Sequence, residues 1–542
     1  MNKGKINRFV DFGSYATYIA VAVIGLVVNW VVLDKCFVMA DDAWYLCLLR
    51  DLPEGQNSSG YLLFGNIFND NIYAIRCACY ILNFISGIVF AIGLFCYADT
   101  RNPIANEGHS RLKVLLNILL WLAIVFAGQL RIVTCPSLNY ITLNQIIMQL
   151  SIGLLLIAVS RRSMVAMFSS GFFAAMLIPV MVTNIVALLF IFFFVAVYMH
   201  LEVDRKDYIG SLVKNFLVYI AGMILFLAIY FIFVQSITTY IDIFISKAGE
   251  TIALDENDYG IKFLYKWLHR TMVFYFMQVV MLAVLLHYIP VLSSRMKLSG
   301  KWAVTFRLLM YVAVFAYIRA AVNYDAMFFL MLLAFYLFID SKNMADRKIQ
   351  LVFLLLMVMP ICLSFGTNNS FHDRGLEYMV FVAPLLMFCS VKWWHKVLSS
   401  GVLIVYAVEL CMSLYSPTWH GDIYAQQKYD IQELGINQKI LVDERTYARI
   451  ETMKPYLHQG DTVWCDTEDW GFVELLNLLP VSYDYNMNRE LVDSVGFVFV
   501  RKDTRYSSIA EHLDMVGGYD KVTYGQFTLY VKNSHDSTVN LP

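Results

Sequence analysis

Two adjacent aspartates, Asp41 and Asp42, follow the first long apolar segment of this chain, at the point where that segment should leave a membrane. An ionisable group at a membrane boundary is costly unless it is solvated, paired or used. One carboxylate can act as a general base on an acceptor hydroxyl, while its neighbour orients it or helps to bind a metal ion. The simpler interpretation is that one aspartate caps a short helix that begins at Ala43. The two roles are compatible, because one acid can cap the helix while the other does chemistry.

A second polar cluster precedes a late apolar segment, within residues 368–388. Arg374 carries a permanent positive charge, which suits a phosphate group. His372 and Asp373 could donate to that phosphate, bind a metal ion or contact a sugar. The simpler interpretation is a solvated turn that caps a helix starting at Gly375.

Further cations are expected on the same side of the membrane. Lys266, His269 and Arg270 share one helical face by their i, i+3 and i+4 spacing. They lie in an amphipathic stretch, 259–270, and could contact a phosphate or a sugar, or simply keep their charged ends at the interface. Other polar groups near the outer ends of apolar segments are Arg76, Arg131, Arg319 and Asp325. The last two could simply pair with each other.

The composition explains why these residues should lie at a membrane surface. Of the 542 residues, 59% are hydrophobic and 15% are charged, whereas a soluble globular protein carries about 25% charged residues. A membrane-spanning helix needs roughly 20 apolar residues. Thirteen such spans, give or take one, are predicted near residues 15–34, 74–98, 112–130, 139–159, 163–180, 183–199, 212–234, 270–290, 303–321, 325–340, 349–365, 376–391 and 396–415. The predicted fold class is therefore mainly α, a polytopic transmembrane helical bundle.

Lys and Arg concentrate in alternate connections between these spans, for example at Arg161 and Arg162 and at Arg295 and Lys297. Short connections rich in Lys and Arg stay in the cytoplasm, so the N-terminus is expected to be cytoplasmic. An odd number of spans then places the acid pair and the C-terminus outside.

The long outer segments are about 35–73, about 235–269 and the tail from about 416. In the tail, residues 495–503 are predicted to form a buried strand, and residues 520–533 a hairpin around Gly525. The predicted domains are a transmembrane domain at 1–415 and a small soluble α/β domain at 416–542.

Several classes of function are disfavoured by what the sequence lacks. The formal net charge of −1 gives no indication of a nucleic-acid partner. No P-loop, HExxH or nucleophile-elbow motif is present. The ten cysteines contain no CxxC pair and are interpreted mainly as small membrane-core residues. No cytoplasmic segment is long enough to bind a nucleotide sugar, so a lipid-linked donor is the more natural one.

The sequence ADDAWY at 40–45, directly after the first span, resembles the acidic motif of the GT-C superfamily of integral-membrane glycosyltransferases. Similar members include protein O-mannosyltransferases, lipid A aminoarabinose transferases and arabinofuranosyltransferases. The resemblance implies a cytoplasmic N-terminus, a similar number of spans and an extracytoplasmic C-terminal domain. It also implies that Asp41 is the general base and Asp42 its companion, or the reverse.

A second family pattern, an Arg, a Tyr and a Pro at the start of a late helix, resembles the order of Arg374, Tyr378 and Pro384, with a wider Arg–Tyr spacing here. It implies that Arg374 binds the phosphate of the lipid donor. The predicted donor phosphate-binding residues are Arg374, His372, Tyr378, Arg270 and Lys266. The predicted substrate-binding residues are Asp373, His269, Arg319, Arg131 and Tyr45.

These features predict an inverting glycosyltransferase that transfers a sugar from a polyprenyl-phosphate donor to a hydroxyl of a glycan, lipid or protein acceptor. A divalent metal ion is left open as a cofactor, and a bacterial inner membrane is the expected location. The alternative is a transporter or flippase of a polar lipid or lipid-linked glycan. Transporters place charges near the bilayer midplane, often in repeated halves, whereas here the charges are predicted at the outer edge. A scaffold without activity is a third interpretation.

A reporter that is active only in the periplasm tests the predicted topology. Fused after Pro542, it should be active, because the distribution of Lys and Arg places the C-terminus outside. The same reporter fused after Arg162, in a predicted inner connection, should be silent. A silent fusion at Pro542 would contradict both the topology and the location of the site.

Overall fold

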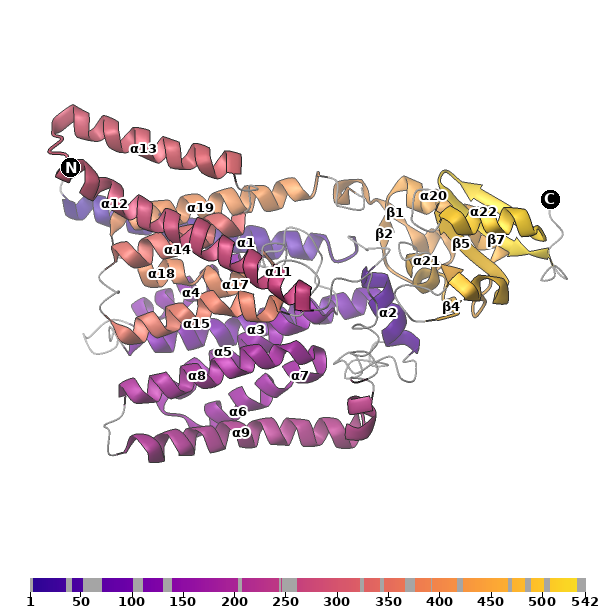
Figure 1. The fold of residues 1–542 in the computed structure, drawn as a ribbon, viewed down its shortest axis with the longest axis horizontal. Coiled ribbons are helices and arrows are strands. Elements are labelled where there is room, and N and C mark those ends of the chain that lie inside the picture. Colours follow the sequence, from indigo (N-terminus) through magenta and orange to yellow (C-terminus); the bar gives the residue numbers. More distant parts are fainter. Residues whose placement is uncertain are drawn as a thin grey trace.

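The computed structural model shows a long bundle of helices with a small sheet region at one end (Figure 1). The described residues are 3–35, 41–51, 71–100, 111–129, 139–202, 207–242, 245, 261–321, 326–341, 346–365, 376–390, 392–416, 423–465, 470–482, 489–501 and 507–533. The first helix, α1 (Lys3–Val31), begins at the end of the bundle that lies farthest from the sheet region (Figure 1).

Within the described residues, nine helical stretches are long and apolar enough to cross a membrane. They are Asp11–Val31 in α1, α3 (Ile72–Asp99), α5 (Tyr140–Arg161), α8 (Ile185–Glu202), α9 (Tyr208–Phe233), Tyr265–Arg295, Gly300–Ile318 in α13 (Gly300–Ala321), α15 (Arg347–Ser364) and α19 (Trp393–Ser413). Shorter apolar stretches, where further spans are predicted, lie in α4 (Arg111–Gly128), α6 (Met164–Ala175) with α7 (Leu177–Val180), α14 (Ala326–Asp340), and α17 (Met379–Val382) with α18 (Leu385–Cys389). The chain is thus a mainly helical membrane protein. The predicted number of thirteen spans stays a prediction.

One helix boundary differs from the sequence-based prediction of an amphipathic helix at 259–270 followed by a separate span. Helix α11 (Ile261–Met272) runs through a π-helical segment, η4 (Val273–Val280), into α12 (Met281–Arg295). No Gly interrupts this stretch, and Pro290 comes only near its end. Without a helix breaker at the change in polarity, the amphipathic and apolar parts form one continuous helix.

Helices α3 and α5, and likewise α6 and α9, pack with their backbones in direct contact. A Cβ atom added at Gly93 would lie 2.3 Å from the carbonyl oxygen of Gly153. A Cβ atom added at Gly222 would lie 2.0 Å from the carbonyl oxygen of Phe168. Lipid provides no hydrophobic force between helices, so close backbone approach at small residues supplies much of the attraction.

A cluster of carboxamides ties α3, α4 and α5 together inside the bundle. The side-chain nitrogen of Gln129 donates to the carbonyl oxygen of Asn83 at 2.8 Å and to Oε1 of Gln149 at 2.7 Å. The side-chain nitrogens of Gln145 and Gln149 both donate to Oδ1 of Asn83, at 3.1 and 3.2 Å. All four side chains are buried. Neutral amides can satisfy one another there without the cost of burying a charge.

The C-terminal sheet region comprises the described residues from 423 to 533, where five strands form a mixed sheet in the order β4-β3-β5-β7-β6. The strands are β3 (Thr462–Cys465), β4 (Leu479–Pro480), β5 (Phe497–Arg501), β6 (Tyr519–Tyr524) and β7 (Phe527–Lys532). β3 pairs in parallel with β4 and β5, whereas β5, β7 and β6 are antiparallel. The predicted strand at 495–503 and the hairpin at 520–533 are confirmed, because β5 is buried and β6 turns into β7 at Gly525, with φ 62°.

Smaller elements complete this region. They are the paired strands β1 (Tyr429–Asp430) and β2 (Leu441–Val442), and the helices α20 (Glu444–Met453), α21 (Trp470–Leu475) and α22 (Ser507–Val516). Helix α21 faces the bundle, and it is the element of the sheet region that packs on helix α2 (Asp41–Asp51).

Replacement of Gly222 by Val should destabilise the protein, because the new side chain would collide with the backbone of α6. Overpacking of this kind costs roughly 1–3 kcal/mol, so the thermal unfolding midpoint in detergent should fall by several degrees. The matched control is Gly210→Val on the same helix, where an added Cβ meets nothing within 4 Å. Val has a higher helix propensity than Gly, so propensity alone should lower the midpoint of neither variant. Equal midpoints would contradict the backbone contact.

Candidate functional site

The acid pair begins helix α2, which lies at the end of the bundle and against the C-terminal sheet region (Figure 1). The helix starts at Asp41 rather than at Ala43, so both aspartates are in its first turn. A negative charge in the first turn interacts favourably with the helix dipole. The side chains of Asp41, Asp42 and Tyr45 lie outside the described part of the structure. Their roles as base, companion and substrate contact therefore stay predictions.

The other end of α2 is fixed by Arg50. Its Nε and Nη2 atoms each donate a 2.8 Å hydrogen bond to the carboxylate of Asp51. Nη1 donates to the carbonyl oxygen of Val473 at 3.2 Å, and Nη2 to that of Leu478 at 2.7 Å. Nη1 also lies 3.3 Å from the carboxylate of Glu474 in α21. The side chains of Arg50, Asp51 and Glu474 are only 6%, 14% and 2% exposed, so this is a buried charge cluster.

The cluster changes the proton affinities of its members. Burial disfavours the charge of Arg50, but the hydrogen bond to Asp51 and the negative charge of Glu474 outweigh burial, so the pKa of Arg50 lies above its ordinary value. Burial raises the pKa of the neighbouring Cys47 thiol, and the negative charge of Glu474 raises it further. Arg50 is therefore a permanent cation, and Cys47 is a protonated, unreactive thiol.

The loop that carries α2 is held where it leaves the first helix. Arg76 of α3 donates to the carbonyl oxygen of Leu33 at 3.2 Å and also to that of Lys35, just after α1. The Arg76 side chain is buried. A guanidinium group thus binds two carbonyl groups of the turn that follows α1.

The C-terminal sheet region contacts both ends of the same loop. The backbone N–H of Leu441, in β2, donates to the carbonyl oxygen of Asp34 at 2.6 Å. The backbone N–H of Ile72, the first residue of α3, donates to the side-chain oxygen of Gln438 at 3.0 Å. Together with the contact of Arg50, these bonds attach the sheet region to the beginning, the helix and the end of the connection between α1 and α3.

The second predicted cluster falls largely outside the described residues, which exclude Arg131, His372, Asp373 and Arg374. Arg319 is placed in α13, but its side chain is not described. Tyr378 ends a short 3₁₀ turn, η6 (Leu376–Tyr378), and its side chain is buried before α17. The contacts of these residues with a donor or substrate stay predictions.

The predicted contacts on α11 are Lys266, His269 and Arg270. All three side chains are exposed. The neighbouring Trp267 is buried, and its ring packs edge-on against Phe365, with 5.2 Å between the ring centroids. Phe365 directly follows α15 and precedes the segment that carries Arg374. The ring contact therefore brings α11 to the start of that segment.

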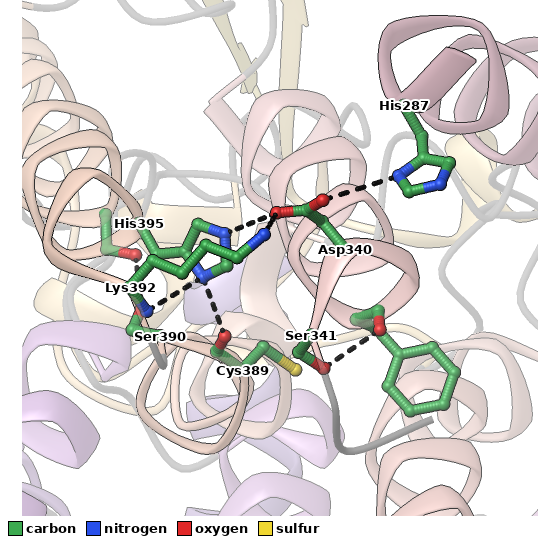
Figure 2. A network of polar contacts seen from close by, with 9 residues as sticks. His287, Asp340, Ser341, Cys389, Ser390, Lys392 and His395 are labelled. Carbon is green, nitrogen blue, oxygen red and sulfur yellow. Dashed lines mark hydrogen bonds and ion pairs between the residues drawn. The ribbon is translucent and has the colours of Figure 1, made fainter. Parts of the chain in front are cut away.

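A polar network that sequence reasoning missed joins α12, α14 and α19 (Figure 2). Asp340, the last residue of α14, accepts hydrogen bonds from Nε2 of His395 at 2.8 Å and from Nζ of Lys392 at 2.5 Å. His287 approaches from the other side, with its Nδ1 3.6 Å from Asp340. Ionisable groups at helix ends in a membrane are costly unless they are paired. We interpret the network as an ion pair that fastens three helices.

This network lies at the end of the bundle opposite to α2. Helix α3 begins at Ile72 beside the sheet region, and near its far end the hydroxyl of Tyr97 donates to the carbonyl oxygen of Lys348 at 2.7 Å. Lys348 lies at the start of α15, shortly after Asp340 along the chain. The network is therefore separate from the acid pair.

A metal ion was left open as a cofactor. Across the described ranges, no group of three or more His, Cys, Asp or Glu side chains is arranged to hold one. The carboxylates of Asp41 and Asp42 are not among the side chains described. The structure therefore does not test a metal at the acid pair, and no chemical step below depends on one.

Comparison with known proteins gives no family. No family model matches the chain, and no curated protein matches it. One solved structure that resembles it is the Archaeoglobus fulgidus oligosaccharyltransferase in complex with zinc and sulfate, at 14% identity and a TM-score of 0.45, covering 96% of this chain and 74% of the other. Another is the archaeal oligosaccharyltransferase AglB from the same organism, with an inhibitory peptide and a dolichol-phosphate, at 12% identity and a TM-score of 0.43, covering 96% and 75%. Both likenesses are too weak to establish the fold or the activity.

Proposed function

We propose that this protein is an inverting glycosyltransferase of the GT-C type that uses a polyprenyl-phosphate-linked sugar donor. The observation that carries the proposal is the position of the acid pair. Asp41 and Asp42 occupy the first turn of a helix at the end of the apolar bundle, and buried hydrogen bonds of Arg50 hold that helix. A carboxylate held there can take a proton from a hydroxyl in water, while the lipid chain of the donor stays in the bilayer.

We further propose that residues 1–415 form the catalytic transmembrane domain and residues 416–542 a periplasmic domain. The distribution of Lys and Arg supports this orientation. The position of the sheet region supports it as well, because this region packs on the helix that begins with the acid pair. A bacterial inner membrane fits a donor that is presented on the outer side of the bilayer.

In the proposed reaction, Asp41 takes the proton of the acceptor hydroxyl, with Asp42 as its companion or with the roles exchanged. The acceptor oxygen bonds to the anomeric carbon as the bond from that carbon to the phosphate oxygen breaks. The bonding electrons leave with polyprenyl phosphate, whose charge Arg374 stabilises. A single displacement of this kind inverts the anomeric configuration. The acceptor is a glycan, lipid or protein.

The donor phosphate is proposed to bind between α11 and the segment that follows α15. The contact of Trp267 with Phe365 supports this location. The further donor contacts are His372, Tyr378, Lys266 and Arg270, and the proposed sugar and acceptor contacts are Asp373, His269, Arg319, Arg131 and Tyr45. An amphipathic helix that continues into a span can meet the donor headgroup at the membrane surface while its apolar part stays in lipid.

Replacement of Asp41 by Asn removes the proposed base but keeps its size. Sugar transfer by purified protein should fall by about 10²–10⁴-fold, the usual contribution of general base catalysis. If Asp41 only caps the helix, the change should be nearly silent, because Asn caps about as well as Asp. The same substitution at Asp42 shows which of the two acids is the general base.

The matched control for both acid variants is Asp520→Asn, which removes an exposed carboxylate from β6 and should leave transfer unchanged. The assay uses a radiolabelled polyprenyl-phosphate sugar and compares variants that insert and elute like the wild type. Full transfer by both Asn variants would contradict the proposed chemistry. Net movement of the labelled lipid across vesicles without sugar transfer would favour the flippase alternative instead.

Replacement of Arg374 by Lys keeps the charge but loses the fork that can bind two phosphate oxygens at once. The KM for the donor should rise by about tenfold, which corresponds to about 1.4 kcal/mol of binding, whereas kcat should change less. Steady-state kinetics with varied donor concentration separate the two. An unchanged donor KM would contradict the proposal that Arg374 binds the donor phosphate.

A further inference from the structure

We propose that Arg50 is a positioning residue for the acid pair, and that the C-terminal sheet region acts through it to hold the first outer loop in its working geometry. This inference rests on the proposed function of Asp41 and Asp42. It concerns a part of the chain outside the acidic motif, and it gives the sheet region a role in catalysis without a direct contact to the substrate.

The first argument is the number of bonds that one side chain makes across two distant segments. Arg50 donates twice to the neighbouring carboxylate of Asp51, and once each to the carbonyl oxygens of Val473 and Leu478. The N–H of Leu478 also bonds to the carbonyl oxygen of Val473, at 2.8 Å. Arg50 therefore binds the turn at the end of α21. The backbone of this turn is already fixed by the hydrogen bond between Leu478 and Val473.

The second argument is the buried face of α2. Ala43, Leu46, Cys47 and Arg50 follow the i, i+3, i+4 and i+7 spacing of one helical face. All of them are buried, and α2 packs against α21. This continuous face fixes the rotation of α2 about its own axis. It therefore fixes the direction in which the first-turn positions, including Asp41, leave the helix.

The third argument is the distance along α2 between Arg50 and the acid pair. Asp41 is the first residue of one continuous helix and Arg50 is its second-to-last residue, and a rise of 1.5 Å per residue separates them by roughly 13 Å. A tilt of α2 at the Arg50 end would therefore shift the acid pair by ångströms. Reacting groups that are misplaced by about 1 Å can lose about 10²-fold in rate.

The fourth argument is that the sheet region holds the loop at three separate points. Besides Arg50, it binds the backbone of Asp34 through Leu441 and the backbone of Ile72 through Gln438. A domain that served only as an appendage would need one attachment, near residue 416 where the chain enters it. Three attachments to one loop are expected of a domain that holds this loop in place.

The charge balance explains why Arg50 matters more than a surface ion pair. The carboxylates of Asp51 and Glu474 are buried beside the guanidinium group of Arg50. Removal of this cation would take a positive charge away from two buried acids, which is much less favourable than the loss of an exposed pair. We call the packed contact between α2 and α21 the joint. It should therefore open when Arg50 is truncated.

The experiment compares the full-length protein with Arg50→Ala, Arg50→Lys and Glu474→Gln. The expected kcat for sugar transfer falls by about 10–100-fold in Arg50→Ala, and by less in the other two, because Lys keeps the charge and Gln keeps the shape and an acceptor. The KM for the donor should stay within about threefold of the wild type, because the proposed phosphate site belongs to α11 and the segment after α15.

The matched control is Lys521→Ala. Lys521 pairs with Asp514 at 2.5 Å in the same sheet region, but that pair is about half exposed and belongs to β6 and α22. Its loss removes one cation from the region without touching α2. Transfer kinetics of this variant should equal those of the wild type.

A second readout reports the joint itself and does not need activity. The Cys47 thiol is fully buried under α21 contacts and protonated in the intact joint, so it should react slowly with a maleimide. Peptide mapping by mass spectrometry should show faster modification of Cys47 in Arg50→Ala, partial protection in Arg50→Lys, and full protection in Lys521→Ala.

The outcomes separate this inference from the proposed function. If the wild type transfers sugar and Arg50→Ala keeps its kcat, Arg50 does not position the acids. If Arg50→Ala raises the donor KM instead of lowering kcat, the residue acts on binding and the positioning role is again wrong. If the wild type transfers no sugar, the proposed function fails, and the reactivity of Cys47 alone then decides whether Arg50 closes the joint.

Discussion

A pair of carboxylates beside a lipid bilayer has to stay in water, so the apolar bundle cannot fix its position by burying it. The position must come from groups that are buried nearby. In this protein a cation near the other end of the same helix, Arg50, is buried, and its hydrogen bonds extend to a segment more than four hundred residues away. The helix that begins with the acid pair is thereby attached at its other end to a frame, the C-terminal sheet region.

The frame depends in turn on how the bundle resists deformation. Backbone contact at Gly93 and Gly153 and the amide cluster around Asn83 fasten α3 to its neighbours. The same helix begins at Ile72, which the sheet region binds, and carries Arg76, which holds the end of α1. Helix α3 therefore connects the interior packing of the bundle to both ends of the loop that carries the acids.

Much of this architecture could be predicted from local sequence patterns. Apolar runs locate the helices, and Gly525 between two alternating segments locates the hairpin, because both signals depend on neighbouring residues alone. The buried partners of Arg50 could not be predicted, since Glu474 looks like any other charged residue until the fold brings it to α2. The pairing of Asp340 with His395 could not be predicted for the same reason, because each residue lies at an ordinary helix end.

The placement of charge also bears on whether chemistry or transport is the better interpretation. The ion pairs that the structure describes within the bundle include Asp99 with Arg161, Glu202 with Lys348, Asp340 with Lys392, and Asp11 with Lys396. They join helix ends on the side away from α2. Between the two ends, the described hydrogen-bond cluster around Asn83 is made of neutral amides. A transporter for a charged headgroup needs polar, ionisable contacts along its route near the midplane, whereas an enzyme that works on one surface needs them only at that surface.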